Sequence, residues 1–150
     1  MEKQITVHSL KETDDLAKRL SALITPHTLI TLSGDLGAGK TTFTKSLGNY
    51  LGVKRNINSP TFTILKIYQG IMPFYHIDAY RLEGIDQELG FEEVFEDAGI
   101  CMVEWPHYIE KQLPKERLEV SISRGEGEEE RTFTFVTHGQ KYDDMLEELA

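Results

Sequence analysis

The residues with the clearest chemical meaning form one short run, Gly34-Asp35-Leu36-Gly37-Ala38-Gly39-Lys40-Thr41. This run matches the pattern G-x-x-x-x-G-K-[ST], in which backbone N–H groups surround phosphate oxygens. In that pattern the lysine reaches the β- and γ-phosphates, and the hydroxyl ligates Mg²⁺. We therefore predict that the chain binds a nucleoside triphosphate and Mg²⁺. The predicted phosphate-binding residues are Gly37, Ala38, Gly39, Lys40, Thr41 and Thr42.

The segments on both sides of this loop have the composition that a phosphate-binding loop needs. Residues 27–33 are mostly apolar and β-branched, which predicts a buried strand before the loop. The residues from Thr42 to about Leu51 predict a helix, with Gly52 as its C-terminal cap. A helix that starts at the loop adds about half a positive charge at its N-terminus, where the phosphates bind.

A magnesium site beside such a loop also requires a carboxylate from a neighbouring strand. Two apolar runs end in an acid: residues 100–103 are followed by Glu104, and residues 74–77 are followed by Asp78. An acid after an apolar run is by itself more often a strand end that faces solvent. In a chain that carries a phosphate-binding loop, we expect at least one of the two to serve the metal site.

Two further positions have an open interpretation. Ser59-Pro60-Thr61 is either a loop that senses the γ-phosphate or a turn that leads into a strand, and the spacing does not choose between them. Trp105 is either a half-buried core residue or a ring that stacks on a base or faces a partner.

The overall composition excludes several classes of protein. A formal net charge of −9 argues against non-specific nucleic-acid binding, so we expect no DNA partner. We find no apolar run of the ~20 residues that span a bilayer and no signal-peptide pattern, so we expect a cytoplasmic protein with no membrane partner. The single cysteine, Cys101, rules out an intramolecular disulfide and is expected in the core. Residues 83–97 carry seven acids and no base, either as a solvated face or as a docking surface for a basic protein.

The order of elements predicts one domain over residues 1–150, in the α/β class. We expect a three-layer P-loop NTPase-like fold with a mixed, partly antiparallel sheet. Besides the loop and its flanks, the predicted elements are a strand at 5–7, a helix that is capped at Ser9 and ends before Pro26, a hairpin of strands 62–68 and 72–78, helices 84–89 and 91–97, a strand at 100–103, a helix at 107–113, a hairpin of strands 118–123 and 132–136, and a helix at 141–150.

Four motifs in order resemble the TsaE family, the small bacterial P-loop ATPases of tRNA threonylcarbamoyladenosine (t6A) biosynthesis. They are residues 34–42, Ser59-Pro60-Thr61-Phe62, His76-Ile77-Asp78-Ala79-Tyr80-Arg81-Leu82 and Glu104-Trp105. The resemblance implies Mg²⁺-dependent ATP hydrolysis in support of the TsaB–TsaD complex. That complex threonylcarbamoylates adenosine 37 of tRNAs that read codons beginning with A. The chain would then meet tRNA only indirectly, through the complex.

The resemblance also implies roles for individual residues. Lys40 and the loop amides would bind phosphates, while Thr41 and Glu104 would hold Mg²⁺. Asp78 would support hydrolysis, either directly or through the metal. Thr61 would belong to a switch-like loop, and Trp105 would lie near the nucleotide. The chemistry of His76 and Tyr80 stays open, and Arg81 is either a charge stabiliser or a partner contact.

Two other functions share the same loop. A small P-loop kinase would need an arginine-rich lid for its acceptor, and none is visible in the sequence. A GTP-binding switch would need [NT]-K-x-D, and the nearest match is Gln140-Lys141-Tyr142-Asp143. We also find no arginine obviously placed as a finger, so we expect low activity without partners. The helix start at Ser9 and the hairpin around Arg124 are both candidates for the adenine pocket.

Overall fold

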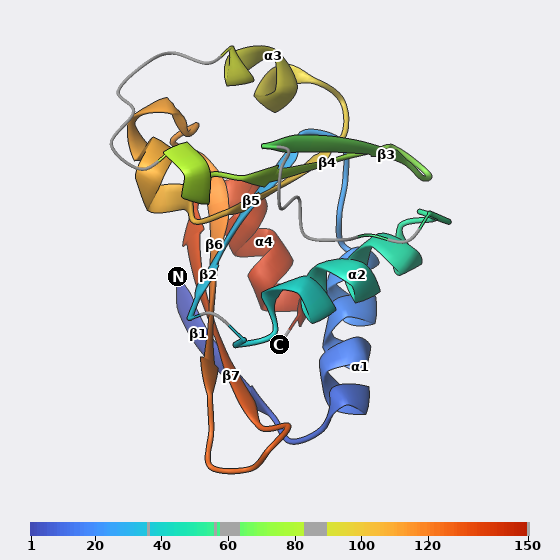
Figure 1. Cartoon of the computed structure of the whole chain (residues 1–150), viewed down its shortest axis with the longest axis vertical. Coiled ribbons are helices and arrows are strands. Elements are labelled where there is room, and N and C mark those ends of the chain that lie inside the picture. Colours follow the sequence, from blue (N-terminus) through green and yellow to red (C-terminus); the bar gives the residue numbers. More distant parts are fainter. Residues whose placement is uncertain (36, 56, 58–63, 83–89, 150) are drawn as a thin grey trace.

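The computed structural model describes residues 1–35, 37–55, 57, 64–82 and 90–149, without the side chain of residue 81. Within these ranges, seven strands form one sheet in the order β1-β7-β6-β2-β5-β4-β3 (Figure 1). The strands are β1 (Glu2–Val7), β2 (Thr28–Gly34), β3 (Leu65–Gln69), β4 (Pro73–Asp78), β5 (Ile100–Glu104), β6 (Arg117–Arg124) and β7 (Arg131–His138). The helices are α1 (Leu10–Ser21), α2 (Lys40–Tyr50), α3 (Phe91–Glu96), α4 (Gln140–Leu149) and the 3₁₀ segments η1 (Tyr80–Leu82) and η2 (Pro106–Gln112).

The centre of the sheet is parallel, and its two edges are antiparallel. Strand β2 pairs in parallel with β5 and β6, and β5 pairs in parallel with β4. The pairs β3–β4, β6–β7 and β1–β7 are antiparallel, which confirms the predicted mixed sheet. The carboxyl ends of β4, β5, β2 and β6 therefore meet at one edge, where open α/β sheets bind their ligands.

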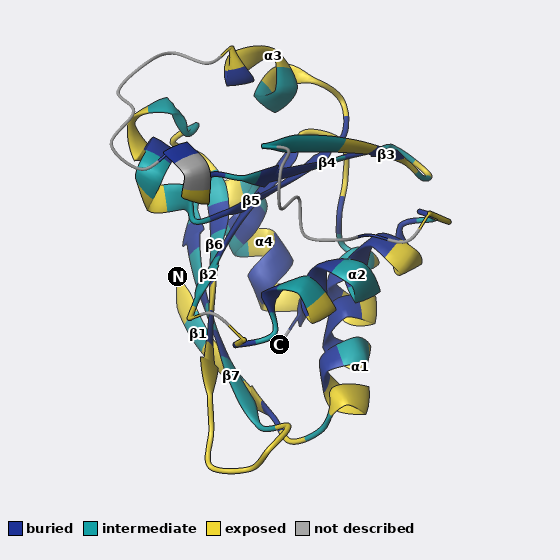
Figure 2. Cartoon of the chain, in the orientation of Figure 1, coloured by how far each residue is buried: buried dark blue, intermediate teal, exposed yellow. Residues whose placement is uncertain are grey.

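Two apolar clusters cover the two faces of the sheet and make the fold three-layered, as predicted. On one face, α1, α2 and α4 pack against alternate residues of the strands, including Leu32, Met102 and Phe133. On the other face, Leu29, Cys101 and Val103 pack against residues of η1, η2 and α3. All five residues of β5 are buried, and buried positions run through the middle of the sheet (Figure 2).

Local sequence signals account for the ends of the helices. The Ser9 hydroxyl accepts a hydrogen bond from the Glu12 N–H at 3.1 Å, as the predicted cap requires. Helix α1 ends at Ser21, well before Pro26, and the N–H of Ala22 bonds to the carbonyls of Lys18 and Leu20. After α2, Gly52 adopts φ +87°, the left-handed conformation of a C-terminal cap. Among the described helices, none is both long enough and apolar enough to cross a membrane.

Other predicted elements need correction or lie outside the described residues. The segment predicted as a helix at 107–113 is the 3₁₀ segment η2, interrupted at Ile109, whose φ of −128° is not helical. Ile109 is buried in the second apolar cluster, so its side-chain packing outweighs the local helical preference. Strand β3 begins at Leu65, so the predicted strand is wrong at Ile64, and its first two residues, 62–63, are not described. The predicted helix 84–89 is not described either.

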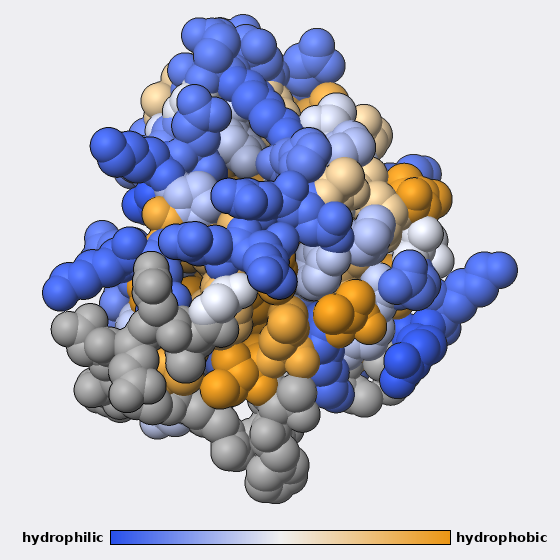
Figure 3. Space-filling model, turned by 90° about the horizontal axis from the view of Figure 1, so that it is seen from above, coloured by the Kyte–Doolittle hydropathy of each residue, from blue (hydrophilic) through white to orange (hydrophobic). Residues whose placement is uncertain are grey.

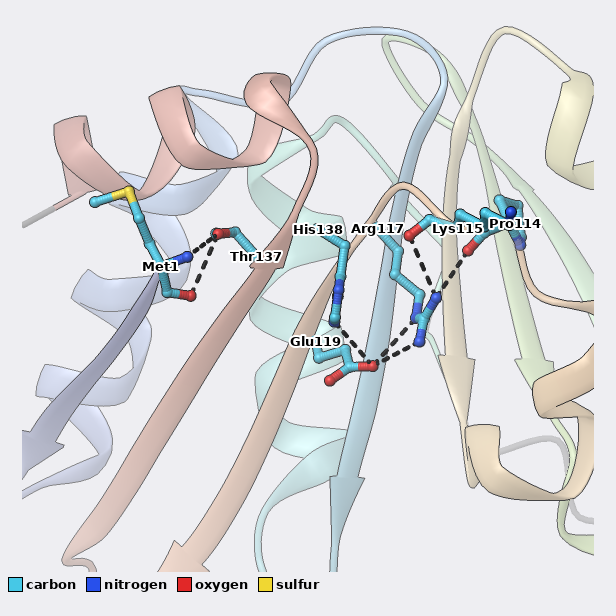
Figure 4. Close-up of polar contacts among 7 residues, drawn as sticks. All are labelled: Met1, Pro114, Lys115, Arg117, Glu119, Thr137 and His138. Atoms are coloured by element: carbon cyan, nitrogen blue, oxygen red, sulfur yellow. Dashed lines mark hydrogen bonds and ion pairs between the residues drawn. The ribbon is translucent and has the colours of Figure 1, made fainter.

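A polar cluster at the amino end of β6 lies away from the edge that carries the loop. Arg117 donates to Glu119 Oε1 at 2.8 Å and to the carbonyl of Pro114 at 3.0 Å (Figure 4). His138 on β7 lies 3.3 Å from the same Glu119 oxygen. Because β6 runs parallel to β2, these groups stand at the end of the sheet opposite Gly34, where β2 leads into the loop.

Candidate nucleotide-binding site

The predicted phosphate-binding loop joins the carboxyl end of β2 to the first residue of α2, Lys40. Gly34 pairs with Ile122 on β6, and a Cβ built on Gly34 would lie 2.6 Å from the Ile122 carbonyl oxygen. A side chain at this position would therefore collide with backbone. Gly39 precedes the helix with φ +104°, a conformation that favours glycine. The sequence thus folds locally into the strand–loop–helix arrangement that the motif requires.

Lys40 is buried beside the two predicted carboxylates. Its ammonium donates to the carbonyl of Gly34 at 2.5 Å and lies 4.1 Å from the centre of the Trp105 ring. Burial lowers the pKa of Lys40, and the charges of Glu104, Asp78 and Asp35 act in the opposite direction. The lysine that is predicted to bind phosphates is thus held by groups of the chain itself.

The strand register places the two carboxylates next to each other. Asp78 on β4 and Glu104 on β5 are direct partners in a parallel pair. Burial raises the pKa of Asp78, as does the charge of Glu104, while the Tyr80 N–H, which donates to Asp78 Oδ1 at 3.0 Å, lowers it. The two acids that the sequence singled out as candidates therefore lie side by side.

A buried histidine completes this group, and sequence reasoning did not find its role. His76 Nε2 lies 2.5 Å from Glu104 Oε2, and the two side chains are 0% and 3% exposed. His76 and Asp78 are two residues apart on β4, so both side chains project from the same side of that strand. That alternation was readable in the motif, but the contact with Glu104 depends on the pairing of β4 with β5.

The other residues that are predicted to bind the nucleotide differ in how far they are exposed to solvent. Ala38 is buried and Gly37 is exposed, while Thr41 is partly buried and Thr42 is exposed. Thr61 lies outside the described residues, so its role in a switch-like loop stays a prediction. In the described part of the chain, the Thr41 hydroxyl takes part in no hydrogen bond.

Trp105 follows Glu104 in a left-handed conformation, with φ +56°. Its ring contacts Tyr80 at a centroid distance of 5.1 Å, besides covering the Lys40 ammonium. Tyr80 is half exposed, and its N–H donates to Asp78 Oδ1, so Tyr80 also lies beside the two carboxylates. Trp105 therefore lies over the lysine, and it also packs, partly buried, against the second apolar cluster.

Two hard oxygen donors could hold a divalent cation here, the Thr41 hydroxyl and the Glu104 carboxylate. Mg²⁺ commonly takes one or two protein ligands and completes its shell with waters and substrate phosphates. Within the described ranges, no group of three or more His, Cys, Asp or Glu side chains could form an all-protein metal site. The donor set thus fits a cation that binds together with a nucleotide.

The molecule is predominantly hydrophilic when it is viewed from above, with a smaller hydrophobic patch (Figure 3). On α3 and directly after it, Glu92, Glu93, Glu96 and Asp97 are exposed. The rest of the acidic stretch, residues 83–89, lies outside the described residues. Its predicted role as a docking surface therefore stays a prediction.

Comparison with known proteins decides which family carries this arrangement. The family model described as "Threonylcarbamoyl adenosine biosynthesis protein TsaE" matches residues 7–133. The chain belongs to the TsaE family. The family takes part in the biosynthesis of threonylcarbamoyladenosine in tRNA, as the resemblance of the four motifs implied.

Individual relatives support the same assignment. The tRNA threonylcarbamoyladenosine biosynthesis protein TsaE of Bacillus subtilis is 50% identical over 141 residues, which cover 93% of this chain and 89% of the relative. The TsaE protein of Synechocystis is 43% identical over 113 residues, or 71% of each chain. The crystal structure of Bacillus subtilis YdiB superposes with a TM-score of 0.81 at 41% identity, over 99% of this chain and 94% of the other.

Proposed function

We propose that this TsaE-family chain hydrolyses ATP in a Mg²⁺-dependent reaction and thereby supports the TsaB–TsaD complex. In this proposal the complex carries out the threonylcarbamoylation of adenosine 37, and the tRNA meets the chain only through the complex. One observation carries the catalytic part of the proposal. The loop lysine, Lys40, lies near enough to Asp78 and Glu104 for the charges of both carboxylates to act on its ammonium.

The first step is nucleotide binding in the loop. Lys40 would leave the carbonyl of Gly34 and bind the β- and γ-phosphates, whose charge replaces the nearby carboxylates as its partner. Trp105 would then lose its cation and become free to contact the nucleotide. The amides around Gly37, Ala38 and Gly39 would surround the phosphate oxygens.

The second step is attack of water on the γ-phosphate. Thr41 and Glu104 would hold Mg²⁺, which neutralises charge on the phosphate oxygens when bound. His76 would keep the Glu104 carboxylate in place through its 2.5 Å contact. Asp78 lies directly beside Glu104 and would orient the attacking water. Burial of this carboxyl raises its pKa above the ordinary value.

The structure weakens the case for a GTP-binding switch. In the nearest match to the guanine motif, Lys141 donates to the carbonyls of Pro26 and His27, just before β2 begins. Asp143 accepts a hydrogen bond from Thr137. Both side chains are thus engaged at the end of the sheet opposite the loop, where a bound base would not reach them. This favours ATP over GTP.

The test is a phosphate-release assay on the purified chain with ATP, with and without TsaB, TsaD and tRNA. We expect slow release by the chain alone and faster release when TsaB–TsaD is added, because a partner can supply groups that a free P-loop lacks. Equal rates with and without the partners would contradict the partner role. A phosphorylated product in place of free phosphate would favour a kinase.

A further inference from the structure

The hairpin of β6 and β7 brings two arginines to the phosphate-binding loop. Arg124 ends β6 and Arg131 begins β7, and the two residues are direct partners in the antiparallel pair. A Cβ built on Gly37 would lie 4.0 Å from Arg124 Nη1, and one built on Gly39 would lie 3.7 Å from Arg131 Nε. Neither arginine belongs to the four motifs, so their position depends on the tertiary structure.

Arg131 is fixed by three carbonyl oxygens. Its Nε donates to Ala38 in the loop at 2.9 Å, and its Nη1 donates to Glu128 and Glu130 at 3.0 and 2.8 Å. The planar guanidinium thus ties the turn of the hairpin to the backbone between Gly37 and Gly39. A lysine could not reproduce this geometry, because its ammonium is a single point of donation.

Arg124 is exposed and has no such engagement. In the part of the chain that the structure describes, it forms neither a hydrogen bond nor an ion pair. Two acids of the same turn are occupied elsewhere: Glu130 accepts from the N–H of Glu126 at 2.8 Å and contacts His8, while Glu129 accepts from the N–H of Leu10. A free guanidinium thus stands beside the loop in a chain whose net charge is −9.

The order of strands says which part of a nucleotide would meet Arg124. Lys40, Asp78 and Glu104 mark the γ-phosphate and metal end, on the side of β5 and β4. Strand β6 lies on the other side of β2. Because a triphosphate is a linear chain, its α-phosphate end extends away from β5 and toward β6.

We propose that the β6–β7 hairpin forms the second wall of the nucleotide site. In this arrangement Arg124 binds the phosphate chain near its α-phosphate, and Arg131 is a positioning residue that holds the loop through Ala38. The inference rests on the proposed function, since it assumes that the loop binds a nucleoside triphosphate. It adds an arginine that is supplied by the chain itself.

The test compares the affinities of four proteins for ATP and for inorganic tripolyphosphate, by calorimetry with Mg²⁺ present. The proteins are the wild type, Arg124→Ala, Arg124→Lys and Lys115→Ala, an exposed charge-matched control before β6. We expect Arg124→Ala to weaken both ligands about 10- to 100-fold, as for loss of a charge-assisted hydrogen bond, with partial recovery in Arg124→Lys. Lys115→Ala should match the wild type.

The outcomes separate this inference from the proposed function. A wild-type chain that binds neither ligand contradicts both. If the wild type binds both ligands and Arg124→Ala binds them equally well, only the role of Arg124 is contradicted. The same holds if Arg124→Ala loses affinity for ATP but not for tripolyphosphate, because the arginine would then contact the nucleoside instead of the phosphates.

The role of Arg131 needs a measurement that a general loss of stability would not reproduce. In Arg131→Lys, we expect amide hydrogen exchange to become faster at Gly37, Ala38 and Gly39 while the amides of β1 and β7 keep their protection. ATP affinity should fall with the faster exchange. Unchanged exchange in the loop, or equal acceleration in β1 and the loop, would overturn the positioning role.

Discussion

His76 Nε2 on β4 lies 2.5 Å from Glu104 Oε2 on β5, and both side chains are buried. The pairing of the two strands also places Asp78 directly beside Glu104. One histidine and two acids from sequence segments 26 residues apart thus form a single charged group under Lys40. Several candidate catalytic side chains therefore lie together beside the loop.

Replacing His76 should weaken metal binding without removing it. In His76→Gln, the Glu104 carboxylate loses its close partner, and we expect the Mg²⁺ concentration for half-maximal ATP hydrolysis to rise about 10-fold or more. A Mg²⁺ titration of phosphate release measures this. His8→Gln, at an exposed position, is the control. An unchanged titration curve in a folded His76 variant would contradict the positioning role.

Replacing Glu104 should remove the metal dependence itself. The Glu104→Gln side chain keeps its shape but loses its charge, so ATP hydrolysis should fall at least 100-fold and respond little to added Mg²⁺. The comparison is ATP binding with Mg²⁺ and with EDTA, in which only the wild type should show a difference. A wild-type metal titration curve in the variant would rule out Glu104 as a ligand.

Lys40→Ala should abolish productive phosphate binding. The variant loses the only buried ammonium in the described part of the site, so we expect an ATP affinity at least 100-fold lower. Lys45→Ala, farther along α2, is the matched control and should bind ATP normally. Trp105 is the single tryptophan of the chain and lies over Lys40, so its fluorescence reports binding directly. Normal ATP turnover in Lys40→Ala would refute the assignment.

Asp78→Asn should stabilise the free protein while it slows hydrolysis. The pKa of Asp78 is raised in the folded state, so the folded chain holds this proton more tightly than the unfolded chain does. Stability is therefore lost as the pH rises from the ordinary pKa, 3.8, through the folded value. An asparagine does not ionise, so the variant avoids this loss of stability. The melting temperature of the variant should therefore exceed that of the wild type at pH 7. The difference should vanish below pH 3.8, and a variant less stable at pH 7 would contradict this account.

Ser9→Ala should lower the stability of the fold without affecting the site. The variant loses the hydrogen bond from the Glu12 N–H to the Ser9 hydroxyl, at a cost of about 1 kcal/mol. Urea unfolding measures the change, with Ser9→Asp as a control that retains the cap. ATP affinity should stay unchanged. Loss of affinity in a folded Ser9→Ala protein would instead support the helix start as part of the adenine pocket.

The local parts of the fold could be predicted because their causes are local. The run from Gly34 to Thr41, the cap at Ser9 and the continuous apolar residues of β5 each specify a conformation through neighbours in sequence. The prediction of a helix at 107–113 was wrong at its centre, where buried Ile109 leaves the helical region. Packing against residues distant in sequence decided that backbone.

The sequence by itself indicated the family, the loop that is predicted to bind phosphates, and the candidate acids Asp78 and Glu104, because each is carried by a motif of adjacent residues. Only the tertiary structure decided that these acids stand together, that His76 holds one of them, and that Arg131 contacts the loop from a hairpin 93 residues away. The physical reason is strand pairing. Register and strand order arise from the burial of a whole sheet, and no short stretch of sequence contains that information.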